Sequence, residues 1–152
     1  MCWHLLESTI NKIEIIIQHS SLNKEPNYSL CIDGNGNVEY NGISNVKTIG
    51  KHVTKLSSND LKRVIHEFDD VYFFSFKDSY HLSDSQQHQP QLLQTSVSLR
   101  LGDKFKNIKY VEGATRLPSE LKDLVKTVEK ITNVDKLSGR ERYWLNASYR
   151  KL

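Results

Sequence analysis

The stretch that decides the fold of this chain is PNYSLCIDGNGNVEYNG, residues 26–42. Its Asp-Gly and Asn-Gly steps supply the positive φ angles that tight hairpin loops need, and alternating apolar residues flank them on both sides. With a three-residue loop at 34–36, the large side chains gather on one surface through the pairs Ile32–Val38, Leu30–Tyr40 and Tyr28–Gly42. A shift of one residue would scatter them over both faces. The stretch therefore predicts a β-hairpin in this register.

Residues 95–111 carry a second hairpin signal, because apolar and polar side chains alternate on both sides of a Gly-Asp step at 102–103. A two-residue loop at this step pairs Val97 with Ile108 and Thr95 with Tyr110. This register again places the apolar groups on one face.

The remaining elements follow from spacing. Short runs rich in β-branched residues predict strands at 13–17 and 46–56, the latter with a candidate bulge at Gly50. Polar capping residues followed by apolar residues three and four apart predict a helix that ends at about Phe68, and the same spacing predicts a final helix over 117–131.

The order of these elements is strands, helix, strands, helix. Strands linked by hairpins are antiparallel, so the sequence predicts an α+β fold: an antiparallel sheet built from hairpins, with two amphipathic helices packed on one face. Residues 11–132 are expected to form this single domain, and 133–152 a basic and aromatic C-terminal tail. The polar segment 77–93 is predicted to be a long loop.

The composition is that of a single soluble domain. Of the 152 residues, 38% are hydrophobic, which is enough for a core at this length. No run approaches the roughly 18 apolar residues of a membrane helix, and the N-terminus lacks the features of a secretory signal. We therefore expect a cytoplasmic protein without membrane contact, with free thiols at Cys2 and Cys31.

A resemblance to a known family rests on these residues in order: Pro26-x-Tyr28-Ser29-Leu30-x-Ile32-x-Gly34-x-Gly36-x-Val38-x-Tyr40-x-Gly42, then Gly50-x-His52, then Phe73-Phe74-x-x-x-Asp78-x-Tyr80. The pattern resembles the family called domain of unknown function 6438, and the similarity covers most of residues 11–132. The resemblance implies a fold but no activity, cofactor or catalytic residue. Members often carry cysteines just before the Pro-x-Tyr step, where this chain has none in 19–25.

Candidate metal ligands lie in the predicted loop, at Asp78, His81, Asp84 and His88. Zinc sites need three or four convergent ligands at familiar spacings, and these spacings match no common template. The Asp-x-Asn-x-Asn run at 33–37 resembles a calcium loop only superficially, because strands flank it and the closing glutamate is missing. We expect neither a metal nor another cofactor.

Candidate catalytic residues are few. Cys31 and His52 could pair as nucleophile and base, but nothing in the sequence places a helix N-terminus or a cation beside the thiol. No phosphate-binding loop, hydrolase elbow or metalloprotease motif occurs. An enzyme of unrecognised type would need a cleft with perturbed titratable groups, for which the candidates are His52, Asp78, Tyr80 and His81.

The net charge of +3 is confined to the end of the chain, because 135–152 hold five Lys or Arg against two Asp or Glu. The candidate interaction residues of the tail are Arg140, Arg142, Tyr143, Trp144 and Arg150. Such a set could meet single-stranded nucleic acid or an acidic protein surface, or Trp144 could pack back on the domain. The sequence favours a non-enzymatic binding or protein-interaction module, with a weak nucleic-acid binder and an enzyme as alternatives.

Overall fold

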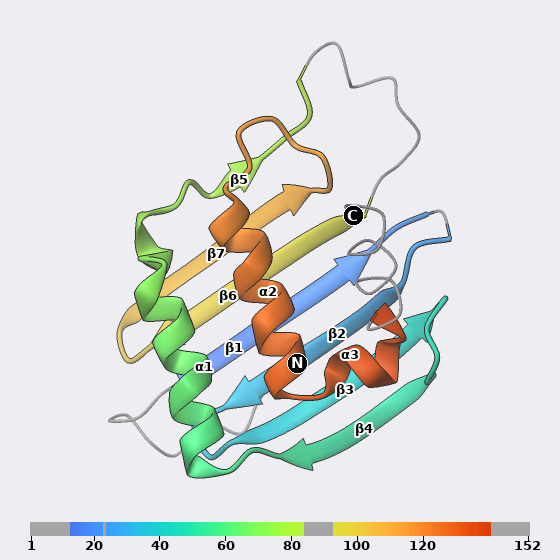
Figure 1. Ribbon diagram of the computed structural model, residues 1–152, viewed down its shortest axis with the longest axis vertical. Coiled ribbons are helices and arrows are strands. Elements are labelled where there is room, and N and C mark those ends of the chain that lie inside the picture. Colours follow the sequence, from blue (N-terminus) through green and yellow to red (C-terminus); the bar gives the residue numbers. More distant parts are fainter. Residues whose placement is uncertain (1–12, 23, 84–92, 141–152) are drawn as a thin grey trace, which may run out of the picture.

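The structure is a computed structural model that describes residues 13–22, 24–83 and 93–140 (Figure 1). One sheet contains the strands in the order β4-β3-β2-β1-β6-β7-β5. The strands are β1 (Ile13–Ser20), β2 (Asn27–Asp33), β3 (Asn37–Ser44), β4 (Gly50–Lys55), β5 (Ser79–Tyr80), β6 (Gln94–Leu101) and β7 (Lys104–Val111). The helices are α1 (Ser58–Asp70), α2 (Ser119–Ile131), α3 (Val134–Ser138) and the short 3-10 helix η1 (Phe73–Ser75).

The first hairpin has the predicted register. The observed pairs are Ile32–Val38, Leu30–Tyr40 and Tyr28–Gly42. The Asp33 carboxylate organises the loop by accepting the backbone N–H groups of Asn35 and Asn37 at 2.9 and 3.0 Å. Gly36 has φ +87°, and a Cβ atom there would lie 2.9 Å from the carbonyl oxygen of Leu56, so the loop needs glycine for both conformation and space.

The second hairpin also has the predicted register, with Val97 opposite Ile108 and Thr95 opposite Tyr110. The sheet as a whole, however, is not built from hairpins alone. β1 pairs antiparallel with the distant β6, and β5 runs parallel to β7. The sheet is therefore mixed and mostly antiparallel. The sequence of a turn predicts only the pairing of the two strands that it joins, so it does not say which distant strands pair.

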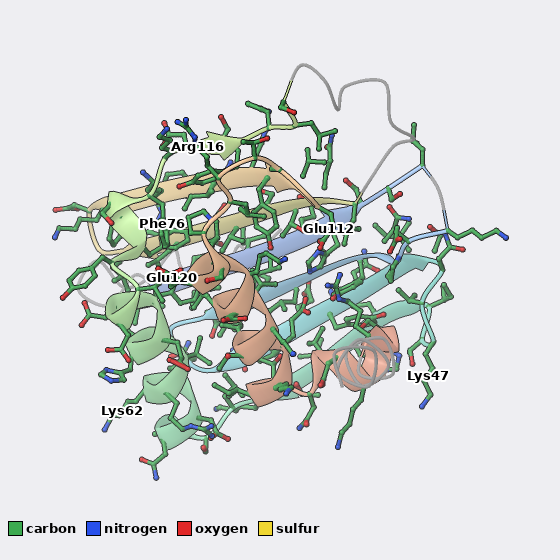
Figure 2. All side chains as sticks on the ribbon, turned by 45° about the horizontal axis from the view of Figure 1, so that its top comes forward. Lys47, Lys62, Phe76, Glu112, Arg116 and Glu120 are labelled. Atoms are coloured by element: carbon green, nitrogen blue, oxygen red, sulfur yellow. The ribbon has the colours of Figure 1, made fainter. Side chains whose placement is uncertain are left out.

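The three α-helices lie on one face of the sheet (Figure 1). Side chains fill the space between the helices and the strands (Figure 2). Ile17 and Leu30 of the sheet share one buried cluster with Phe68 of α1 and Leu121 of α2. Burial of this apolar surface is the main stabilising term of the fold. Within the described ranges, no helix has the length and apolar character needed to cross a membrane.

The sequence-based prediction has no counterpart of α3. Its Val134 belongs to the core, and the carbonyls of Leu137 and Ser138 accept backbone hydrogen bonds at 2.8 and 3.2 Å from the segment that precedes β4. Because these bonds hold that segment against the helix, the strand expected from residue 46 begins only at Gly50. The first residues of the predicted tail therefore pack on the domain.

Cys31 is disulfide-bonded, which corrects the expectation of free thiols. It lies on the face of β2 opposite to the helices, because its neighbours Leu30 and Ile32 enter the core. The other cysteine of the chain, Cys2, lies outside the described residues. Structural disulfides are rare in reducing compartments, so the bond gives no support to the cytoplasmic location, which stays a prediction.

Candidate functional site

A row of polar side chains crosses the helix-covered face of the sheet near the end of β1. Strand register places its members side by side on β2, β1, β6, β7 and β5: Tyr28, His19, Thr95, Tyr110 and Tyr80. All are buried. Buried hydroxyl and imidazole groups need hydrogen-bond partners, so the row must be completed by groups from the helices or from within itself.

Glu129 of α2 completes the row. The Tyr28 hydroxyl donates to Glu129 Oε2 at 2.6 Å, and His19 Nε2 lies 2.8 Å from the same oxygen. On its other side, His19 Nδ1 lies 2.9 Å from Thr95 Oγ1. A carboxylate with 0% exposure is thus held by side chains from two strands, and the network joins α2 to the middle of the sheet.

The neighbours of Glu129 stabilise its negative charge. Burial raises the pKa of this carboxyl, but the charge and hydrogen bond of His19 and the charge of Arg140 outweigh burial, so its pKa lies below the ordinary 4.5. Arg140 Nε lies 3.9 Å from Glu129 Oε1, which has no hydrogen-bond partner among the described residues. Burial and the nearby carboxylate raise the pKa of Tyr28, which keeps its hydroxyl protonated as a donor.

The order Thr95–His19–Glu129 has the hydroxyl–imidazole–carboxylate sequence of an acyl-transfer triad. A nucleophile must meet its substrate, however, and these three side chains are 3%, 2% and 0% exposed. Both ring nitrogens of His19 are already engaged inside the network. The geometry therefore fits a structural role, in which the network holds α2 on the sheet.

A pocket of about 380 Å³ lies at the same end of the strands. It is lined mainly by residues 18–20 of β1, 94–96 of β6 and 109–111 of β7. Side chains alternate along a strand, and the middle residue of each of these segments faces the helices. The flanking side chains therefore point to the opposite face, so the pocket lies on the side of the sheet that α1, α2 and α3 leave open.

The pocket lining is polar, and much of it is not engaged elsewhere. Among the described residues, no side-chain partner occurs for Gln18, Ser20, His81, Gln94 or Lys109. These groups come from β1, β6, β7 and the residue after β5, so strand pairing alone brings them together. The hollow thus collects amide, hydroxyl, imidazole and ammonium groups that are available to a ligand.

The structure brings together only part of the predicted cleft, which comprised His52, Asp78, Tyr80 and His81. Tyr80 and His81 line the pocket. Asp78 is close to it through its carbonyl, which accepts the Lys109 N–H at 2.9 Å. His52 lies on β4, at the opposite edge of the sheet from β5. His52 is therefore not part of the arrangement, although the other three candidates come from one short stretch.

The other candidate arrangements can be placed as well. The Cys31 thiol is not available as a nucleophile because it is disulfide-bonded, and the register also puts Cys31 and His52 on opposite faces. Asp84 and His88 of the considered metal set lie outside the described residues. Within 13–22, 24–83 and 93–140, no group of three or more His, Cys, Asp or Glu side chains is arranged to hold a metal ion.

The tail candidates are described only in part. Arg140 is the last described residue, and its side chain, 12% exposed, faces the buried Glu129. It thus belongs to the network and not to an exposed basic surface. Arg142, Tyr143, Trp144 and Arg150 lie outside the described residues.

Comparison with protein families gives one match: the sequence model of the domain of unknown function DUF6438 matches residues 16–132. The chain belongs to the DUF6438 family. The matched region of this DUF6438 protein holds both hairpins, α1 and α2, and with them the pocket strands and Glu129. A comparison with curated proteins found no match.

Sequence reasoning missed the network and the pocket lining on β1 and β6. One signal for the network was present: Glu129 stands four residues after Val125 and one after Val128, on the apolar stripe of α2. A glutamate on such a stripe must be paired in the core, and a buried histidine or tyrosine is a suitable partner. The pocket side chains carry no such signal, because they look like ordinary solvent-facing residues of half-buried strands.

Proposed function

We propose that this DUF6438 domain is a non-enzymatic binding module whose ligand is a small polar molecule seated in the pocket on the open face of the sheet. The observation that carries the proposal is the convergence of unengaged polar side chains around a hollow of about 380 Å³. That volume is in the range of known small-molecule sites, about 300–1,000 Å³. Strands also hold their side chains more rigidly than loops do, which lowers the entropic cost of binding.

The distribution of titratable groups supports binding over catalysis. The carboxyl group with a lowered pKa, Glu129, lies in the core on the other side of the sheet. Tyr110 reaches both regions, and burial raises its pKa, so its hydroxyl stays neutral. The sheet thus separates the carboxyl group with the lowered pKa from the pocket, which favours binding over catalysis at the pocket.

The test is a fragment titration followed by amide shifts in the NMR spectrum of the ¹⁵N-labelled chain. We expect polar fragments to shift the amides of 18–20, 94–96 and 109–111. Gln18→Ala and Gln94→Ala should weaken these effects, whereas Asn41→Ala, which removes an exposed amide elsewhere on the same face, should not. Shifts confined to other regions, or equal affinities in all three variants, would refute the proposal.

The tail remains the basis of the alternative function. If the chain binds single-stranded nucleic acid through 141–152, a chain truncated after Arg140 should lose the affinity, and the full chain should show a shallow salt dependence, about −0.7 per neutralised phosphate. Truncation at this point keeps α3 and the Glu129 network intact. Retained affinity in the truncated chain would exclude the tail as the site.

A further inference from the structure

The charged and chargeable side chains of the described pocket lining are all basic, and this bears on the ligand that the proposed function leaves unspecified. The described lining includes Lys109, His81 and His19 but no aspartate or glutamate. His19 is committed to Glu129 and Thr95, which leaves Lys109 and the His81 imidazole as charged or chargeable groups at the hollow. A pocket of this kind disfavours cations and attracts anions.

Lys109 has no counter-ion in the described part of the chain, because the nearby carboxylates are paired with other lysines. The Asp78 carboxylate lies 3.2 Å from Lys106 Nζ, on the helix-facing side of β7. Glu112 Oε1 lies 3.9 Å from Lys122 Nζ of α2. Neither the Asp78 nor the Glu112 carboxylate therefore neutralises the positive charge of Lys109.

The backbone holds both groups in place. Lys109 lies on β7, which is paired on both sides, with Ser96 of β6 opposite Lys109 on one side and Ser79 of the edge strand β5 on the other. His81 follows β5 directly, and its carbonyl accepts the Thr115 N–H at 3.2 Å. Because both main-chain segments are hydrogen-bonded, the two side chains extend from fixed positions into the same hollow.

We propose that the pocket binds a small molecule through an anionic oxygen group, a carboxylate or a phosphate, placed between Lys109 and His81. The ammonium and imidazole N–H groups donate to the anion, and Gln18, Gln94 and Ser20 bind the polar remainder of the ligand. Charge-assisted hydrogen bonds are about twice as strong as neutral ones, so this pair would dominate recognition. The inference rests on the proposed function and adds the chemical class of the ligand.

The experiment titrates the ¹⁵N-labelled chain with inorganic phosphate, with succinate and with glycerol at constant ionic strength. Phosphate or succinate should shift the amides around Lys109 and His81 at lower concentrations than the neutral molecule glycerol does. Lys109→Gln should lower the affinity of the pocket for the anion about tenfold, as expected for the loss of one charge-assisted hydrogen bond. Lys104→Gln is the matched control, because Lys104 is exposed at the other end of the same strand.

Comparison of the two anions separates phosphate from carboxylate recognition, since the preferred probe identifies the group. Equal binding by Lys109→Gln and wild type, or anion shifts centred on Lys104, would overturn the inference. If neutral fragments shift the pocket amides while both anions leave them unchanged, the anion inference fails and the proposed function survives. If neither anions nor neutral fragments bind, both fail.

Discussion

Glu129→Gln should destabilise the domain severely, although it changes a single oxygen into an amide nitrogen. The carboxylate accepts from Tyr28 at 2.6 Å and from His19 at 2.8 Å, and it is fully buried. Glutamine keeps the shape and one acceptor oxygen, but it removes the negative charge that faces His19 and lies 3.9 Å from Arg140 Nε. Breaking a buried charged pair costs about 3–5 kcal/mol, a large part of the total stability of about 5–15 kcal/mol.

The assay is urea denaturation at pH 7, followed by circular dichroism. Glu120→Gln provides the matched control, because Glu120 is exposed in the first turn of the same helix and should change stability by less than about 0.5 kcal/mol. Tyr28→Phe removes one hydrogen bond and should cost about 1.5–3 kcal/mol. In the double variant Tyr28→Phe with Glu129→Gln, the two effects should be coupled by about 0.5–3 kcal/mol, since the Tyr28 hydroxyl donates directly to the Glu129 carboxylate.

The comparison of wild type with Glu129→Gln also has an expected pH dependence of stability. The folded pKa of Glu129 lies below its ordinary 4.5, so its stabilising effect is present above this pH and is lost as the pH falls through the folded pKa. The difference between wild type and Glu129→Gln should therefore be constant near neutrality and shrink below about pH 4.5. Equal denaturation midpoints at pH 7, or strictly additive effects with Tyr28→Phe, would refute the account of the network.

Three further predictions concern the core, the first hairpin and the disulfide. Leu124→Ala should cost about 2–5 kcal/mol in denaturation, because Leu124 is buried in α2, while the exposed neighbour Asp123→Ala should be nearly neutral. Gly36→Ala should be more destabilising than Gly102→Ala, since both have positive φ but only the first lacks space for a Cβ atom. Cys31 should resist alkylation in the denatured chain until a reductant is added, as read by mass spectrometry.

Each of these predictions has a clear contrary outcome. An unchanged midpoint for Leu124→Ala would mean that the apolar stripe of α2 does not face the core. Equal losses for the two glycine variants would remove the steric argument at the hairpin loop. Alkylation of Cys31 without reductant would restore the original expectation of a free thiol.

The local elements of this protein could be predicted from the sequence. Asp-Gly and Asn-Gly steps specify the φ angles of the loop at 34–36, and alternation then leaves one register that buries the large side chains, as the Leu30–Tyr40 pair shows. The stripe of α2 is equally local, because residues three and four apart share a helix face. These signals come from neighbours in the chain, so no tertiary contact is needed to read them.

Tertiary structure alone decided the pairing of β1 with β6 and the parallel addition of β5 to β7. The entropic cost of closing a long loop differs little between one distant partner strand and another. Which strands pair therefore depends on the packing of the whole core and not on a local motif. That choice brings Gln18, Gln94 and Lys109 to one hollow and separates His52 from His81 by the width of the sheet. The packing of α2 on this sheet also brings Glu129 to His19 and Tyr28, so that a charged residue on an apolar helix face is hydrogen-bonded inside the core.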